Sequence, residues 1–147
     1  MTARTDRPIE PEGLVTELEP GECWELLTRT RFGRIALPCG DDDIDIYPID
    51  FAVDGRDLVF RTAEGTKLLE VVLFGRITLE ADERDAERGI AWSVVVKGRP
   101  EVLELTGEIE AAERLGIEPW TRTPKNRFVR ITETRVSGRR LYAPLGD

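Results

Sequence analysis

Apolar and polar side chains alternate along much of the chain, and this pattern is typical of half-buried β-strands. The stretch 44–53 shows it clearly and carries Pro48, which predicts an edge strand or a bulge. Asp54 and Gly55 then predict a hairpin turn into a strand at 57–62. Further strands are predicted at 34–38, 76–81, 90–105, 128–131 and 134–141. The interruption at 98–100, Gly-Arg-Pro, predicts a bend or bulge at a barrel corner.

Helical signals are short. Pro20 and the apolar positions that follow it predict a helix that Gly33 ends, and a second helix is predicted at 106–115 with Gly116 as its exit. A third short helix is plausible at 68–72. The chain has no regular alternation of strands with long helical crossovers. We therefore predict an α+β fold, a mainly antiparallel barrel of about six strands with a few short helices.

The 147 residues match the size of one domain. Residues 1–18 combine prolines and acidic side chains with little periodicity, so we predict a flexible N-terminal arm there, able to embrace a partner subunit. The folded domain is predicted at 19–147.

Composition excludes several classes of function. The sequence contains no histidine, which rules out imidazole acid–base catalysis, a histidine-ligated haem and most zinc sites. A net charge of -8 argues against binding to nucleic acid or to anionic membranes. No apolar stretch approaches the roughly 20 residues of a membrane span, and no secretory signal opens the chain. We expect a cytoplasmic protein whose Cys23 and Cys39 are reduced thiols.

One segment carries the chemistry of a phosphate site. Arg61, Thr62, Thr66 and Lys67 surround Gly65 where a strand is predicted to meet a helix. Guanidinium, ammonium and hydroxyl donors beside the backbone N–H groups of a helix start suit a phosphate monoester. The alternative is a threonine that caps the helix, flanked by two solvated cations.

A second basic region lies between Trp120 and Arg140. It is either a pair of solvated strands or a local anion site completed in a dimer. Its cations are Arg122, Lys125, Arg127, Arg130, Arg135, Arg139 and Arg140, and Glu133 is the acidic residue among them.

Four blocks in this order resemble the FMN-binding split-barrel family of pyridoxamine 5′-phosphate oxidase-like proteins. They are 33–36, 47–55, 58–67 and 91–98, and the resemblance extends over roughly 20–141. It implies that 19–147 is an FMN-binding split-barrel domain and that the cofactor lies at a homodimer interface. The basic C-terminal strands or Trp120 could then reach the cofactor of the partner.

The same resemblance implies the cofactor-binding residues and no catalytic side chain. Arg61, Thr62, Thr66 and Lys67 would hold the phosphate and ribityl chain. The isoalloxazine ring would be bordered by Pro48, Ile49, Asp50 and Phe51, with Trp92 and Ser93 on the facing strand. Phe60 is a further predicted flavin neighbour. Phe51, Phe60 and Trp92 are also predicted to be core residues, and the two roles are compatible.

We therefore hypothesise an FMN-dependent oxidoreductase whose flavin transfers a hydride or electrons between an electron donor and a small substrate. The alternatives are a non-catalytic flavin-binding or sensing module, a reductase that uses the deazaflavin F420, and a barrel that has lost its cofactor. Two features depart from the family pattern. Asp50 places a carboxylate beside the expected flavin, where it would disfavour an anionic reduced ring unless it is paired. The lack of histidine argues against oxidation of vitamin B6.

Overall fold

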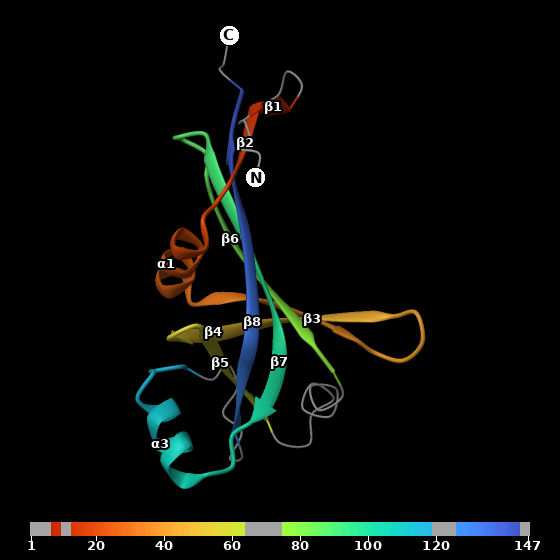
Figure 1. Cartoon of the computed structure of the whole chain (residues 1–147), viewed down its shortest axis with the longest axis vertical. Helices are drawn as coiled ribbons and strands as arrows, with labels where there is room; N and C mark the ends of the chain where they lie inside the picture. Colours follow the sequence, from red (N-terminus) through yellow and green to blue (C-terminus); the bar gives the residue numbers. More distant parts are fainter. Residues whose placement is uncertain (1–6, 10–12, 64–74, 119–125, 145–147) are drawn as a thin grey trace.

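The computed structural model describes residues 7–9, 13–63, 75–118 and 126–144. In this part of the chain eight strands form one antiparallel sheet in the order β1-β2-β8-β5-β4-β3-β6-β7, and β7 pairs with β8 to close a barrel (Figure 1). The bounds are β1 Arg7–Ile9, β2 Gly13–Glu17, β3 Phe32–Pro38, β4 Ile44–Asp54, β5 Asp57–Ala63, β6 Ile77–Asp85, β7 Ile90–Val102 and β8 Asn126–Tyr142. The predicted α+β class with a mainly antiparallel split barrel is confirmed.

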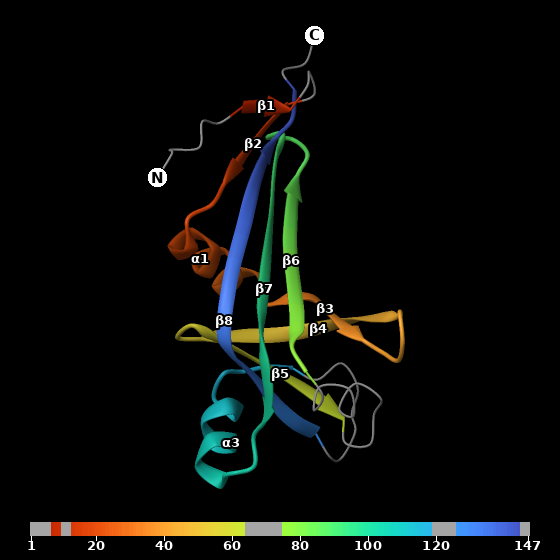
Figure 2. The same ribbon diagram turned by 45° about the vertical axis from the view of Figure 1, so that its right-hand side comes forward.

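Two strands lie where the sequence suggested a loose arm. β2 pairs with the end of β8, with Leu14 opposite Tyr142 and Val15 opposite Leu141, and β1 pairs with β2. Both lie at the upper end of the long β6-β7-β8 ribbon (Figure 2). The two strands are short, and the prolines at 8 and 11 interrupt the alternation of apolar and polar residues around them. The sequence pattern therefore does not predict either strand.

The two described helices are short. α1 spans Pro20–Thr30 and α3 spans Thr106–Glu113, and neither is long and apolar enough to cross a membrane. α3 ends at Glu113 with Arg114 as its C-cap, two residues before the predicted end, and Gly116 follows with a φ of 70°. The helix predicted at 68–72 lies outside the described residues.

The predicted end of α1 was wrong. The helix stops at Thr30, and Arg31 caps it in the left-handed conformation with a φ of 60°. Gly33 instead lies inside β3, where a Cβ atom would stand 2.5 Å from the backbone oxygen of Glu80. Gly33 thus allows the close approach of β3 to β6. In the sequence alone, a glycine shortly after a helix looks like the residue that ends it.

The bulge predicted at 98–100 is confirmed by a register shift between Lys97 and Arg99 where β7 pairs with β8. A Cβ atom on Gly98 would lie 2.7 Å from the oxygen of Thr132, so a side chain would not fit without displacing the strand. The two strands predicted at 128–131 and 134–141 are one strand, β8. Glu133, with a φ of 50°, lies between the two predicted segments.

Two apolar clusters hold the fold together. The larger one fills the barrel and is covered on one side by α1; it includes Leu27, Ile35, Phe51, Phe60, Leu79, Val94 and Ile131. The smaller one lies between α3 and the outer side of the barrel, and it contains Ala52, Val59, Leu103, Ala112, Ile117 and Phe128. The β3–β4 hairpin projects from the barrel (Figure 2).

Candidate functional site

Arg61 occupies the end of β5, on the side of the barrel that faces α3. Its register partner on β8 is Phe128, and its guanidinium carbon lies 4.7 Å from the centre of that ring. Nη1 donates a hydrogen bond to the carbonyl of Ile117 over 3.2 Å. Nε is buried and has no hydrogen-bond partner among the described residues. A buried donor without an acceptor is destabilising. The Nε–H group of Arg61 is therefore free to donate a hydrogen bond to a ligand.

Thr62 follows Arg61 on β5, but successive side chains of a strand point to opposite faces. Thr62 is 8% exposed, pairs with Arg127 in the β5–β8 register and lies on the same side of the strand as Phe60, whereas Arg61 shares its side with Val59. The two side chains can therefore approach one ligand only around the end of the strand. Thr66 and Lys67, predicted for the same phosphate, lie outside the described residues, as does Trp120.

Four of the residues predicted to border the flavin ring are packed inside the barrel. They are Ile49, Phe51, Phe60 and Trp92, with relative exposures from 0% to 7%. Phe51 and Phe60 face each other in the β4–β5 register. The predicted role of Phe51, Phe60 and Trp92 as core residues is confirmed.

The other predicted ring neighbours lie on the outer face of the barrel. Pro48 is exposed and stands opposite Arg34 on β3, and Asp50 is half-buried two residues further along β4. Among the described strands only β3 pairs with β4 over 44–50, so Pro48 is on a free edge as predicted. Ser93 on β7 donates to the carboxylate of Glu80 over 2.8 Å.

Sequence reasoning missed a polar cluster between Pro48 and Ser93. Arg34 donates to the carboxylates of Glu80 and Asp82, the latter over 2.7 Å. Burial and the neighbouring Asp82 raise the pKa of Glu80, although Ser93 and Arg34 oppose the shift. The hydrogen bond to Glu80 in turn raises the pKa of Arg34. Only the alternation of polar residues on β6 hinted at this cluster. The register that pairs β3 with β6 cannot be predicted from the sequence.

Replacing Glu80 with glutamine tests this cluster. A raised carboxyl pKa means that the folded state holds the proton more tightly than the unfolded chain, so the parent loses stability as pH rises through that pKa. The stability of Glu80→Gln relative to the parent should therefore increase between about pH 4 and about pH 7, by no more than about 1 kcal/mol at this half-exposed site. Urea unfolding at both pH values measures it.

The control for this experiment is Glu83→Gln, which changes an exposed carboxylate on the same strand. A stability of Glu80→Gln relative to the parent that falls as pH rises would contradict the assigned direction.

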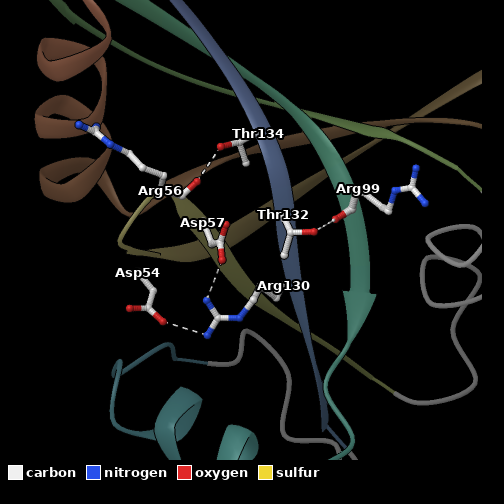
Figure 3. A network of polar contacts seen from close by, with 7 residues as sticks. All are labelled: Asp54, Arg56, Asp57, Arg99, Arg130, Thr132 and Thr134. Carbon is white, nitrogen blue, oxygen red and sulfur yellow. Dashed lines mark hydrogen bonds and ion pairs between the residues drawn. The ribbon is translucent and has the colours of Figure 1, made fainter.

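The basic residues of β8 are largely engaged with carboxylates. Arg130 bridges Asp54 and Asp57 with N–O distances of 2.9 and 3.3 Å (Figure 3). Burial opposes its charge, but these two partners outweigh burial and raise the pKa of Arg130. Next to this bridge Thr134 donates to the carbonyl of Arg56 over 2.6 Å. Arg140 forms an ion pair with Glu22 on α1, and Arg127 lies 3.9 Å from a carboxylate oxygen of Glu104. Much of this region is therefore structural.

Residues 19–140 match the protein family described as pyridoxamine 5′-phosphate oxidase. The chain belongs to this family. Protein Rv3129 of Mycobacterium tuberculosis strain H37Rv is 41% identical over 96 residues, which are 65% of this chain and 86% of that protein. The resemblance seen in the sequence is thereby confirmed.

Solved structures of similar proteins agree with membership of the pyridoxamine 5′-phosphate oxidase family. An FAD binding protein from Mycobacterium smegmatis is 35% identical, with a TM-score of 0.75 over 86% of this chain and 98% of that chain. An FAD-binding protein from Mesorhizobium loti is 29% identical, with a TM-score of 0.73 over 86% of this chain and 97% of that chain.

Proposed function

We propose that this chain binds a flavin nucleotide whose phosphate is held at the end of β5. Arg61 and Thr62 would contact the phosphate, together with Thr66 and Lys67 from the segment that follows. The observation that carries the proposal is the buried Arg61 Nε, which has no acceptor among the described residues. Membership of a flavin-associated family and the two similar FAD-binding proteins support it.

A phosphate fits the donor set at Arg61. The guanidinium already donates Nη1 to Ile117 and stacks on Phe128, so its position is fixed before any ligand arrives. A phosphate oxygen accepts without donating, and hydrogen bonds from a charged donor contribute roughly 1.5–3 kcal/mol each. Supplying an acceptor to Nε also removes the penalty of an unsatisfied buried donor.

The choice of flavin remains a proposal. The sequence resemblance predicts FMN, whereas the two similar proteins from Mycobacterium smegmatis and Mesorhizobium loti are FAD-binding proteins, which favours FAD. Both carry a phosphate on the ribityl chain, so Arg61 would serve either. F420 would need a basic groove for its anionic tail, and Arg130 and Arg140 are already paired with carboxylates in the region expected to provide one.

With a flavin bound, the chemistry supplied by the cofactor is hydride or electron transfer. The protein would hold the cofactor, orient it and shield it from water. No acid or base is required of the side chains, which suits a chain without histidine. We propose an oxidoreductase that acts on a small molecule; a non-catalytic flavin carrier is the alternative.

Purified protein should show flavin absorbance, and mass spectrometry of the released chromophore identifies FMN, FAD or F420. Protein without chromophore is incubated with each compound and its dissociation constant is measured. A flavin bound at about one copy per chain supports the proposal. Binding of none of the three would refute it, and selective binding of F420 would move the function to deazaflavin chemistry.

We also propose that the chain is a homodimer joined through the outer face of the β3–β4 hairpin. Ile44 and Ile46 on this face are each 65% exposed. The acidic turn at 41–43 adjoins them, and the exposed Arg135 and Arg139 lie on β8. A two-fold axis could bring the acidic hairpin of one copy onto the basic strand of the other.

Substituting both Ile44 and Ile46 with lysine should raise the dimer dissociation constant at least about tenfold, because each isoleucine buried in an interface contributes roughly 1.5–3 kcal/mol. Light scattering coupled to size-exclusion chromatography measures the mass. Leu105→Lys is the control, since Leu105 is 67% exposed beside α3 and away from the hairpin. A monomeric parent, or a double variant that stays dimeric, would contradict this interface.

A further inference from the structure

Two arginines from different elements donate to three successive carbonyl groups beyond the end of α3. Nη2 of Arg31, the residue that caps α1, lies 2.6 Å from the oxygen of Leu115 and 3.2 Å from that of Gly116. Nη1 of Arg61 lies 3.2 Å from the oxygen of Ile117. These carbonyl groups lie outside the helix, and the two guanidinium groups supply hydrogen-bond donors to them.

Arg31 occupies a backbone position that favours glycine. Its φ is 60°, and both its peptide groups are in use: its N–H donates to Leu27 over 3.4 Å, and its carbonyl accepts from the N–H of Phe51 over 3.0 Å. A side chain in this conformation is destabilising by roughly 1–2 kcal/mol relative to glycine. Arginine at this position provides the hydrogen bonds to Leu115 and Gly116, which glycine would not.

We propose that Arg31 is a positioning residue for the phosphate site. It fixes the segment 115–117, so the carbonyl of Ile117 holds the guanidinium of Arg61 over Phe128. In that position the Nη1 of Arg61 is satisfied and its Nε is left as the donor for an added acceptor. This inference rests on the proposed function, because it requires Arg61 to bind the phosphate of a flavin nucleotide.

Arg31→Gly tests the role of the side chain without disturbing the cap, since glycine adopts the left-handed conformation freely. The readout is the ratio of the dissociation constants for riboflavin and FMN, which isolates the phosphate. We expect this ratio to fall about three- to tenfold, equivalent to one hydrogen bond, while riboflavin binding stays unchanged. FAD is titrated in parallel. Arg31→Lys, which keeps a cationic donor at the end of a long side chain, should recover part of the ratio.

Glu133→Gly is the matched control. Glu133 has a φ of 50° within β8 and an exposed side chain, so the substitution relieves the same kind of strain and should leave the ratio unaltered. Combining Arg31→Gly with Arg61→Ala should weaken FMN binding no further than Arg61→Ala alone, because both changes act through one guanidinium.

The NMR signal of the Arg61 Nε–H group in ligand-free protein gives a readout that needs no flavin. We expect Arg31→Gly to shift or broaden it, and Glu133→Gly to leave it in place. An unmoved signal, an unchanged ratio, or an equal loss of riboflavin and FMN binding would each overturn the positioning role. A parent protein that binds no flavin, or binds FMN no tighter than riboflavin, would instead overturn the proposed phosphate site, whatever the NMR signal does.

Discussion

Arg61→Ala is expected to weaken the binding of FMN or FAD about tenfold to a hundredfold, because a hydrogen bond from a charged donor contributes roughly 1.5–3 kcal/mol. The loss should be confined to flavins that carry a phosphate. Riboflavin, which has none, should bind the variant and the parent alike. Fluorescence titration of the three flavins against both proteins measures the effect.

Arg61→Lys refines this prediction. Lysine keeps the positive charge but lacks the planar fork that lets one guanidinium donate to Ile117 and to a ligand at once. Its affinity for FMN should lie between those of the parent and Arg61→Ala. Arg99→Ala removes an exposed arginine on β7 and serves as the control. Equal affinities of Arg61→Ala and Arg99→Ala for FMN would remove Arg61 from the site.

The barrel could be predicted because local signals agree with it. Alternation at 44–53, the turn at Asp54 and Gly55 and the bulge near Gly98 all correspond to features of the structure. Each depends on residues close in sequence, whose physical preferences are independent of the rest of the fold. The buried aromatic residues followed from the same alternation.

Long-range register could not be predicted. Arg34 meets Glu80 only because β3 pairs with β6, and that pairing depends on the whole sheet rather than on either strand. The contact of Arg61 with Ile117 likewise depends on where α3 packs. These are the contacts that define the candidate site, so sequence reasoning found Arg61 but missed Arg31, Phe128 and the carbonyl groups around them.

The separation of the predicted site residues has a physical cause. Residues adjacent on a strand face opposite sides, so a continuous sequence block such as 48–51 cannot present all its side chains to one ligand. Ile49 and Phe51 point into the core, whereas Pro48 and Asp50 lie outside it. Half of such a block builds the barrel, and only the other half is free to contact a cofactor or a second subunit.

Phe51→Ala should lower the free energy of unfolding by about 3–5 kcal/mol, because it leaves a cavity in the barrel core. Phe51 is fully buried, faces Phe60 across the β4–β5 pair, and its backbone N–H donates to Arg31. The loss should be the same with and without flavin, since the side chain acts as part of the core. Urea unfolding of cofactor-free protein measures it.

Phe51→Leu, which fills most of the volume, should lose much less, on the order of 1 kcal/mol. Ile46→Ala, on the exposed part of the same strand, should change the stability of the monomer by no more than about 0.5 kcal/mol. If Phe51 were mainly a flavin neighbour, Phe51→Ala would instead leave the cofactor-free stability nearly intact and reduce only the stabilisation gained on adding flavin. The two roles therefore separate in one set of unfolding curves, measured with and without cofactor.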